Sequence, residues 1–399
     1  MKKQRNSGFN QFMRLLKTEF KRIFSNNVLV VVFFGAPLLY GIMFAHVYKQ
    51  GKLTDMPVAV IDKDQTALSA KIIEAINDNE ALNVTKVQFD ETGIAREMPT
   101  KEYVAVVVIP ENFEADVLQK RYPEIMADVN TANLVTANFA SKGLQTVLGT
   151  ISAGIEIEAL KKAGMDPQTA AQRFEPFKVN YNRFYNSSGN YLNLLYPGIL
   201  ATVMQQIILL GLGLAFARDF EDGYFLKLVR VSKSSFYHIM LKIIPFIPLI
   251  TFVWMIIASF YVIYDIEMQV FTPAMVLLCT VFSLACISIG LLCSLAIPNQ
   301  LRATEILMVI AMPSFLLSGF TWPLSGMPPL IQEIAKMLPL THFLDGFRKL
   351  VVYGGTFSDI VVPFRALCIT AIVCFIGIVV LHQIKIRRTQ KKLSAVKTA

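Results

Sequence analysis

Six apolar runs separate the polar segments of this 399-residue chain. A helix needs about 20 mostly apolar residues to cross a hydrocarbon core about 30 Å thick. The runs cover residues 28–46, 194–217, 240–264, 271–297, 303–320 and 364–384. Pro37 inside the first run is tolerable in a membrane helix, and Pro245 and Pro248 predict a bent entry into the third. We therefore predict an α-helical polytopic membrane protein with six transmembrane helices.

The segment between the first two runs, residues 47–190, has a different pattern. Strands are predicted at 57–62, 82–89, 103–109 and 124–129. Helices are predicted after the turn DKDQTALS through about residue 78, near 91–98, and over 111–120, where Pro110 stands at the start. This alternation indicates an α/β domain with a mixed sheet. Residues 131–163 are long for a globular helix and predict a helical stalk or hairpin.

Composition supports the same division. The chain is 54% hydrophobic and 17% charged, against about 25% charged residues in a typical soluble domain. Residues 48–190 carry 15 Lys and Arg against 19 Asp and Glu, a net charge of −4. The remainder carries 23 against 10, a net charge of +13. One stretch therefore resembles a soluble domain, and the rest resembles membrane helices with basic flanks.

Loop charge predicts the orientation, because cytoplasmic loops of membrane proteins are enriched in Lys and Arg. The basic side comprises the N-terminus with Lys2, Lys3, Arg5, Arg14, Lys17, Lys21 and Arg22, the loop with Arg218, Lys227, Arg230, Lys233 and Lys242, the turn with Arg302, and the tail with Lys385, Arg387, Arg388, Lys391, Lys392 and Lys397. Six spans with both termini in the cytoplasm place every one of these clusters inside. The first run is expected to remain as an anchor, since no cleavage motif of small residues follows it.

An amphipathic helix is predicted before the first span. Its apolar face consists of Phe9, Phe12, Met13, Leu16, Phe20, Ile23 and Phe24, and its polar face of Gln11, Arg14, Lys17, Thr18, Lys21 and Arg22. This spacing is typical of a helix that lies in the membrane interface. It is interpreted either as a simple anchor or as an elbow that carries force from a cytoplasmic partner to the spans.

The motifs that would make this chain an enzyme are absent from the sequence. It contains no GxxxxGK[ST] phosphate loop, no HExxH, no nucleophile elbow and no CxxC. The five cysteines lie in apolar stretches and are interpreted as small packing residues: Cys279, Cys286, Cys293, Cys368 and Cys374. Asp62 and Asp64 are interpreted as part of a helix cap rather than as a metal site. We expect no catalytic residue, no metal and no bound cofactor in this chain.

Two loops carry most of the functional information. The inner loop, residues 218–238, has an acidic cluster before Gly223, then apolar residues among cations; we predict a short amphipathic element with charges exposed to a partner. The outer segment, residues 321–363, contains a helix at 328–338 that is too short to span, so it is re-entrant or interfacial. Trp322, Phe343 and Phe347 are interpreted as interfacial aromatics there. The four histidines, His46, His238, His342 and His382, are far apart in sequence and read as interfacial.

The order of these features resembles the membrane subunits of ABC-2 type exporters of the type V group. In ARDFEDGYFLKL, Arg218, Asp219, Glu221, Asp222 and Gly223 resemble the family's coupling loop E-R-E-x-G-T-L, although Tyr224 replaces the usual Thr. The family's SG-F-x-x-P-x-x-x-M-P run is similar to Ser318–Phe320 followed by Pro323, Met327 and Pro328. DKDQTALS and VVVIPENFE look like the extracytoplasmic domain of the drug- and lipid-exporting subgroup.

The resemblance implies a specific domain organisation. The expected parts are a connecting helix (1–27) that includes Phe12, Leu16 and Phe20, the first span (28–46), an extracytoplasmic α/β domain with stalk (47–190), the bundle of spans two to six (191–385) and a basic tail (386–399). Polar positions on the second and fifth spans are candidates for the translocation path, or equally for helix–helix contacts: Asn193, Gln205, Gln206, Ser314 and Ser318.

The resemblance also implies the partners and the function. Two permease subunits pair as a homodimer or heterodimer, and each docks a separate subunit that binds ATP and Mg²⁺. A periplasmic adaptor is a further partner of some such systems. The assembly moves an amphipathic, drug-like or lipid-like substrate out across a bacterial inner membrane. The alternatives are a non-transporting component of a secretion apparatus and an extracytoplasmic receptor; a receptor requires a cytoplasmic output module, but the longest cytoplasmic stretch is about 27 residues.

Overall fold

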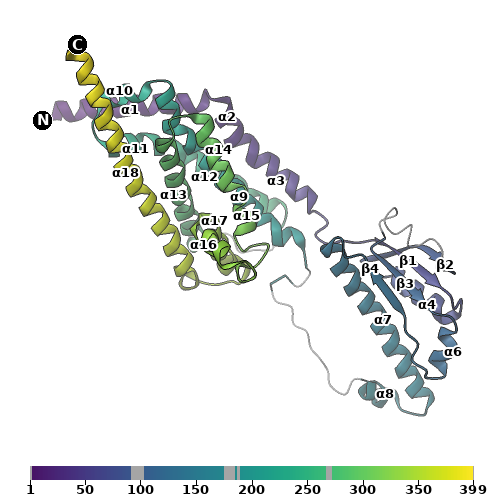
Figure 1. The fold of residues 1–399 in the computed structure, drawn as a ribbon. Helices are drawn as coiled ribbons and strands as arrows, with labels where there is room; N and C mark the ends of the chain where they lie inside the picture. Colours follow the sequence, from purple (N-terminus) through teal and green to yellow (C-terminus); the bar gives the residue numbers. More distant parts are fainter. Residues whose placement is uncertain (1, 91–102, 175–184, 187–188, 267–271, 399) are drawn as a thin grey trace. The chain divides into compact units, whose positions relative to one another are not determined.

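The chain folds into two compact units, shown in Figure 1. The computed structural model describes residues 2–90, 103–174, 185–186, 189–266 and 272–398. One unit is a helical bundle formed by Met1–Gly51 and Phe184–Ala399, and the other is an α/β unit formed by Lys52–Arg183. The helix expected near residues 91–98 lies outside the described residues.

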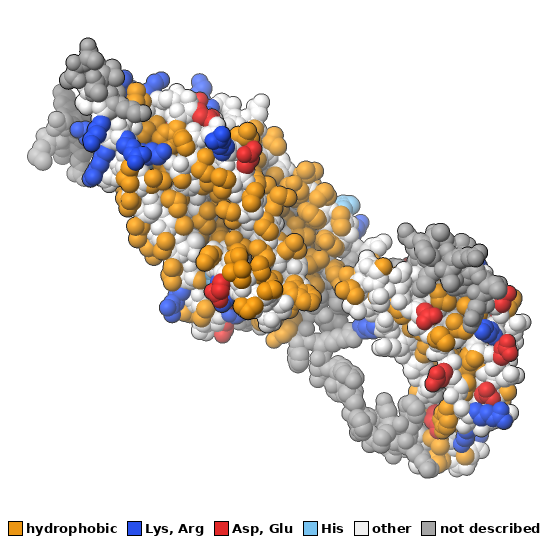
Figure 2. Space-filling view, viewed as in Figure 1, with side chains coloured by type: hydrophobic (Ala, Val, Ile, Leu, Met, Phe, Trp, Pro, Cys, Tyr) orange, Lys and Arg blue, Asp and Glu red, His pale blue; other side chains and the backbone are white. Residues whose placement is uncertain are grey.

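Within the described residues of the bundle, six helical segments are long and apolar enough to cross a membrane, as the sequence predicts. They are Asn27–Val47, Tyr191–Glu221, Ser235–Ile263, Pro273–Ala296, Gln300–Leu317 and Phe357–Lys391. An exposed apolar belt covers the visible face of this unit (Figure 2). The amphipathic helix α1 (Lys2–Phe24) precedes the first span, and α1 lies at the same end of the bundle as the C-terminal part of α18 (Val361–Thr398) (Figure 1).

Proline interrupts several spans at the positions where the ring removes a backbone donor. The first span consists of α2 (Asn27–Val30), a π-helical turn (Val31–Gly35) and α3 (Ala36–Val47), with Pro37 in the first turn of α3. The third span consists of α11 (Ser235–Ile243) and α12 (Phe246–Ile263), which break at Pro245. The fifth consists of α14 (Gln300–Ala311) and α15 (Ser314–Leu317), which break at Pro313. Kinks at prolines and π-turns are the usual way for long helices to bend.

The second span is the centre of the bundle. α9 (Tyr191–Glu221) is 72% buried over its apolar window, the largest share of any span. It packs closely against α13 (Pro273–Ala296), where a Cβ atom on Gly290 would lie only 2.9 Å from Cβ of Leu212. Small residues allow membrane helices to approach each other in this way. α9 is therefore the element against which the other spans are positioned.

Between the fifth and sixth spans the chain forms short helices. They are a 3₁₀ turn (Leu324–Gly326), α16 (Pro329–Met337), α17 (Pro339–Phe347), a π-helical turn (Arg348–Val352) and a 3₁₀ turn (Phe357–Ile360). α16 agrees with the helix predicted at 328–338. Phe343 and Phe347, predicted as interfacial aromatics, are only 1% and 2% exposed, so that interpretation is wrong. Phe343 stacks on Phe282 of α13 with ring centroids 4.3 Å apart, because α17 turns its aromatic face into the bundle.

The described residues of the α/β unit form a four-stranded mixed sheet in the order β2-β1-β3-β4. Its strands are β1 (Met56–Asp62), β2 (Leu82–Gln88), β3 (Ala105–Ile109) and β4 (Met126–Val129). β1 runs parallel to β2 and β3, and β4 is antiparallel to β3. The central strand pairs Val58 with Ala105 and Val60 with Val107.

Helices α4 (Ala67–Asn77) and α7 (Leu134–Lys162) pack on one face of this sheet. Ile72 and Ile76 of α4 and Leu144 of α7 join Val58 and Val60 in one core. The helix predicted over 111–120 is shorter in the structure: α6 spans Phe113–Leu118. It begins late because Asn112 has a left-handed backbone with φ of 56°, which a helix cannot include. α8 (Pro167–Phe174) follows α7.

Candidate functional site

The predicted inner loop is mostly helical. α9 continues through Arg218 and Asp219 to Glu221, and Gly223, with φ of 67°, turns the chain into α10 (Tyr224–Val231). A left-handed backbone suits glycine at a helix junction. The loop predicted to start at residue 218 therefore starts four residues later, because the apolar period of the sequence ends before the helix does.

A buried charge network lies beside this junction, and we define it as Glu19, Arg22, Asp219 and Lys242. Asp219 and Lys242 are 0% and 2% exposed as side chains, and Lys242 Nζ lies 2.7 Å from Asp219 Oδ2. Lys242 Nζ also donates hydrogen bonds to both carboxylate oxygens of Glu19, at 2.9 and 2.8 Å. Arg22 Nη1 lies 2.8 Å from Asp219 Oδ1. The network therefore joins α1, the end of α9 and the start of the third span.

The network is electrically balanced, with two cations and two carboxylates. Its two contacts to Asp219 are ion pairs without good hydrogen-bond alignment, so Coulomb attraction is their main contribution. Burial raises the pKa of Glu19 above its ordinary value, an effect that outweighs the opposing attraction of Lys242. A buried carboxylate is costly unless it is paired, and here each one has a cation within 3 Å.

Tyr224 covers the network on the side of α10. The Arg22 guanidinium lies 4.2 Å from the centre of the Tyr224 ring, within the range of a cation–π interaction. Burial, together with the nearby Glu19 carboxylate, raises the pKa of the Tyr224 phenol to about 12. Where the resembling family has Thr, this chain thus has an aromatic ring that packs against a half-buried arginine.

Three further contacts tie the junction together. Asp222 Oδ2 accepts a hydrogen bond from Arg22 Nη2 at 3.0 Å. Arg218 Nη1 donates to the backbone oxygen of Arg22 at 2.8 Å. Glu221 accepts hydrogen bonds from the backbone nitrogen of Gln300, at 2.8 Å, and from the Gln300 side chain, at the start of α14. The acidic cluster therefore binds its own chain.

The predicted exposure of this cluster is wrong for one residue. Arg218, Asp219, Glu221 and Asp222 were expected to offer exposed charges to a partner; Asp219 is fully buried, whereas Glu221 and Asp222 are exposed and Arg218 is half-buried. The face that α10 leaves exposed consists of Leu226, Lys227, Arg230 and Val231, while Phe225, Leu228 and Val229 are buried.

The connecting-helix residues face the same end of the bundle. Phe12 packs edge-on against Tyr237 of α11, with ring centroids 5.1 Å apart. Leu16 and Phe20 are half-buried and Ile23 is buried, whereas Phe9 and Met13 are exposed. The predicted apolar face of α1 is thus partly used for packing on the bundle.

Two of the four histidines meet beside the junction, contrary to their separation in sequence. The rings of His238 and His382 lie 5.1 Å apart, and both side chains are 0% exposed. His238 Nε2 donates to the backbone oxygen of Leu228 at 3.1 Å, because a carbonyl can only accept. His382 Nδ1 lies 3.1 Å from Ser235 Oγ. The pair connects α10, α11 and α18, which no local sequence signal could show.

The predicted path residues are dispersed among different environments. Gln205 is 1% exposed, and Gln206 and Asn193 are half-buried. Ser314 Oγ donates to the backbone oxygen of Ile310 at 2.8 Å, and Ser318 Oγ donates to that of Phe315 at 2.6 Å. These two hydroxyls are satisfied within their own helical segment, whereas Gln205 Oε1 has no partner among the described residues. Gln205 remains the best candidate of the five for contact with a polar group.

The outer segment is arranged around an arginine that the sequence did not single out as functional. Arg348 Nη2 donates to the backbone oxygens of Gly319 and Phe320, at 3.3 and 3.0 Å. Its guanidinium lies 5.0 Å from the centre of the Phe320 ring. Pro323 and Pro328 are exposed and Met327 is half-buried. The SGF run is thus held by Arg348, and the later part of the motif faces outward.

Neither the helix-capping aspartates nor any other group forms a metal centre in the part of the chain that the structure describes. Asp62 Oδ1 accepts from the backbone nitrogens of Asp64 and Gln65, and Asp62 Oδ2 accepts from Ser69 Oγ. Thr66 caps α4 through a capping box with Ser69.

Comparison with known families decides the identity. Residues 28–380 match the family described as ABC-2 family transporter protein. The chain belongs to this family. Among its relatives are the inner membrane transport permease YhhJ of Escherichia coli K12, 22% identical over 78% of this chain and 81% of the relative, and the probable multidrug ABC transporter permease YbhS of the same organism, 24% identical over 80% of each. The linearmycin resistance permease protein LnrN of Bacillus subtilis is 22% identical over 86% of this chain and 91% of the relative.

Membership makes this chain a multi-pass membrane protein and a transport permease. The family match spans all six apolar helical segments in part or whole and the α/β unit between the first and second of them. The matched residues include α10 and two members of the network, Asp219 and Lys242. The other two members, Glu19 and Arg22 of α1, precede the match.

Proposed function

We propose that this ABC-2 family member is the permease subunit of an ATP-driven exporter, and that a separate subunit hydrolyses the ATP. The substrate class that we propose is amphipathic, drug-like or lipid-like, moved outward across a bacterial inner membrane. In this proposal both termini are cytoplasmic and the α/β unit is extracytoplasmic, since that orientation places the basic clusters inside.

The buried charge network is the observation that carries the proposal. A helix that only anchors a chain in the interface needs no buried ion pairs. Here Glu19 and Arg22 of α1 meet Lys242 and Asp219, whose sequence positions are about 200 residues away, at 2.8–2.9 Å. Breaking such pairs leaves buried charges unpaired, so α1, α9 and α11 move together more easily than they separate. This supports the elbow interpretation of α1.

The docking surface that we propose is the exposed face of α10. Leu226, Lys227, Arg230 and Val231 stand on this face, followed by Lys233 and Phe236, which is 62% exposed. An apolar centre with a cationic rim fits a partner groove with an acidic rim. ATP-driven closure of two such partners would press on α10, and the network would transmit the movement to the second and third spans.

The proposed assembly contains two permease subunits and two ATP-binding subunits. In this assembly ATP and Mg²⁺ bind to the ATP-binding subunits and not to this chain. The names of the relatives, a multidrug transporter permease and a linearmycin resistance permease, support an amphipathic drug-like cargo. A periplasmic adaptor is a further proposed partner of the extracytoplasmic unit.

Co-purification with a co-expressed candidate ATP-binding subunit tests the proposal, followed by ATP hydrolysis with and without candidate substrates. The double variant Lys227→Glu, Arg230→Glu should reduce the amount of co-purified subunit severalfold, because it reverses two charges at the contact. Lys120→Glu, an exposed cation of the α/β unit, is the matched control. Undiminished co-purification and substrate-stimulated hydrolysis in the double variant would contradict the docking surface.

A second pair of variants separates docking from coupling. Glu221→Ala with Asp222→Ala removes contacts to Gln300 and Arg22 inside the chain, so it should leave docking in place and lower substrate stimulation of hydrolysis. Failure of the ATP-binding subunit to co-purify with the unmodified chain would reject the exporter proposal as a whole.

A further inference from the structure

The first turn of α17 places a helix N-terminus inside the bundle. α17 has nine residues and is continued by the π-helical turn that follows it. Leu338 occupies the N-cap position with an extended backbone and without a capping side chain. Leu338, Leu340 and Thr341 are all buried. The N-terminus of a helix carries a partial positive charge, so a buried one attracts a negatively charged group with acceptor oxygens.

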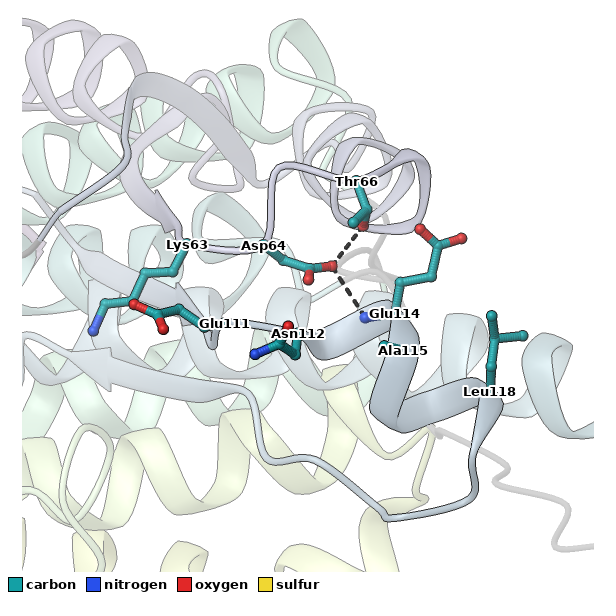
Figure 3. Close-up of a pocket in the computed structure, with 8 residues that line it drawn as sticks. All are labelled: Lys63, Asp64, Thr66, Glu111, Asn112, Glu114, Ala115 and Leu118. Carbon is teal, nitrogen blue, oxygen red and sulfur yellow. Dashed lines mark hydrogen bonds between the residues drawn. The ribbon is translucent and has the colours of Figure 1, made fainter.

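Several other helices of the chain have an acceptor oxygen at this end. Side-chain oxygens of Ser234, Thr272 and Asn299 cap α11, α13 and α14. At α6, the Asp64 carboxylate accepts hydrogen bonds from the backbone nitrogen of Glu114, in the first turn, and from Thr66 Oγ1 (Figure 3). Among the residues that the structure describes, no side-chain oxygen accepts a hydrogen bond from the first turn of α17.

Thr341, in this first turn, has a hydroxyl group without a partner. Other buried hydroxyls of the bundle donate to the backbone oxygen four residues earlier, as those of Ser283, Ser288 and Ser314 do. Thr341 is 3% exposed, and among the described residues its Oγ1 is the one hydroxyl of a buried serine or threonine that makes no hydrogen bond. Because the Cα–Cβ bonds of a helix tilt toward its N-terminus, this hydroxyl points to the same end as the N–H groups of the first turn.

The register of α9 against α13 fixes the depth of Gln205 in the bundle. The backbone nitrogen of Phe216 donates to Ser294 Oγ at 3.4 Å, and the two residues are 78 positions apart in the sequence. The close approach of Gly290 to α9 has the same offset, so the two helices run parallel. Gln205 therefore lies at the level of Ser283.

The packing of α17 places its first turn at the same depth. Phe343 stacks on Phe282, and the next turn of α17 packs against Leu278, so α17 runs antiparallel to α13 and its N-terminus points away from the outer end of α13. Thr341 precedes Phe343 by two residues, which puts it within one helical turn of the depth of Gln205. α17 also packs against α9 itself.

Gln205 is a second buried polar side chain at this depth. It is 1% exposed, and its Oε1 has no hydrogen-bond partner among the described residues. Most buried polar groups in proteins are paired, so two unpaired ones on neighbouring helices need an explanation. The sequence of α9 from residue 192 to 217, that of α13 and the first turn of α17 contain no Asp or Glu, so no carboxylate of these segments would repel an anion.

We propose that the first turn of α17, Thr341 and Gln205 bind the anionic group of an amphipathic molecule. The N–H groups of the turn and the Thr341 hydroxyl would donate to its oxygens from one side, and the Gln205 amide would donate from α9. Both side chains are enclosed in this conformation, so α17 would move aside to admit the group. The inference deepens the proposed export function and rests on it for one point, that the bound molecule is the transported substrate.

Methyl NMR of the full chain in lipid nanodiscs tests this site, with leucine methyl groups labelled and the Leu340 signals assigned from Leu340→Ile. The probe is 4-phenylbutyrate, and 4-phenylbutyramide is its uncharged counterpart of similar shape. The carboxylate should shift the Leu340 signals to saturation and the amide should not. The signals of Leu39, which is 62% exposed on α3, report partition of either compound into the lipid.

Variants of the two side chains show which groups hold the carboxylate. Thr341→Val keeps the shape of the side chain and should weaken binding about tenfold, because it removes a hydrogen bond to a charged group. Thr341→Ser keeps the hydroxyl and should retain the affinity. Gln205→Met should also weaken binding about tenfold. Gln206→Met is the matched control, since Gln206 is half-buried on the same turn of α9, and it should leave the affinity unchanged.

Three results would each overturn the proposal: equal shifts from the carboxylate and the amide, no saturable shift at Leu340, or undiminished affinity in both Thr341→Val and Gln205→Met. The measurement contains no ATP-binding subunit, so its failure would leave the exporter proposal untouched. If instead the ATP-binding subunit failed to co-purify, the exporter proposal would fall, and saturable binding at Leu340 would still support the anion site.

Discussion

Lys242 is the side chain whose removal tests the buried charge network most directly. It is 2% exposed and contacts the carboxylates of Glu19 and Asp219 at 2.8 and 2.7 Å. The variant Lys242→Met keeps most of the apolar stem and removes the charge. Removing one partner of a buried ion pair costs about 3–5 kcal/mol, because the other charge is left buried and unpaired. We expect the midpoint of thermal unfolding of the bundle to fall by roughly 10 °C, at about 2–4 °C per kcal/mol.

The loss of stability caused by Lys242→Met should depend on pH. Burial raises the pKa of Glu19 above its ordinary value of 4.5, and Lys242 partly opposes this rise. A group whose pKa is raised in the folded state contributes stability that is complete below its unfolded pKa and is lost as pH rises through the folded pKa. Without Lys242 the folded pKa of Glu19 rises further. The variant should therefore be closer to the unmodified chain at about pH 5 than at about pH 8.

Circular dichroism of the purified full chain in detergent, with size-exclusion chromatography after heating, measures these midpoints. Lys336→Met is the matched control, because its pair with Glu333 is 53% and 65% exposed and should contribute only about 0–1 kcal/mol. Adding Glu19→Gln to Lys242→Met should recover part of the loss by removing one unpaired carboxylate. Equal shifts for Lys242→Met and Lys336→Met, or a deficit that does not change with pH, would refute the reasoning.

Three further predictions use the same unfolding assay. Tyr224→Phe keeps the ring beside Arg22 and should cost under about 1 kcal/mol, whereas Tyr224→Leu should cost about 1–2 kcal/mol more through the lost cation–π contact; equal effects of the two would contradict it. Gly290→Ala should destabilise the bundle by about 1–3 kcal/mol, since its Cβ would lie 2.9 Å from Cβ of Leu212 and 3.3 Å from the backbone oxygen of Leu209. Gly149→Ala in α7 is the control for Gly290→Ala, because its added Cβ would have no atom within 4 Å. It should stabilise the α/β unit by about 0.5–1 kcal/mol, and a loss of stability would contradict the argument that steric contact decides the effect of Gly290→Ala. Asp62→Ala removes three hydrogen bonds and should cost about 1–3 kcal/mol in the α/β unit; added Ca²⁺ should leave the midpoint of the unmodified chain in place, and a rise would reopen the metal interpretation.

Most of the fold follows from local patterns in the sequence. The apolar runs and the strand and helix periods of the α/β unit depend on neighbouring residues, so six spanning segments and four strands can be placed without tertiary information. The predicted ends of helices are less accurate where a part of the chain that is distant in sequence stabilises the last turn. α9 extends beyond the apolar run through Arg218 and Asp219, because Arg22 and Lys242 neutralise a carboxylate that would otherwise favour solvent.

The candidate site could be placed only in outline. The predicted segment 218–238 contains one short helix of its own, α10 (Tyr224–Val231), between the end of α9 and the start of α11, and the side chains that complete the network beside it were not identified. Lys242 stands at the edge of an apolar run and Glu19 lies among cations in α1, and neither position has a local signal for burial. The same holds for His238 and His382, which are 144 positions apart in the sequence and meet only through the packing of α11 and α18. A pairing across such separations is a property of the tertiary fold.

The basic residues where α1, the end of α9 and α10 meet have two different roles. Counting them predicts only their side of the membrane. Arg22 and Lys242 point inward and are neutralised by Glu19 and Asp219, so the network itself adds no net charge. Lys227 and Arg230 remain exposed on α10. A partner that approaches this surface therefore meets the cations of α10 beside the exposed side chains of Glu221 and Asp222, whereas Asp219 is buried. Because the acids hold α1 against α9 while the cations face outward, a substitution among the acids should change how movement is transmitted, and a substitution among the exposed cations should change whether the partner binds.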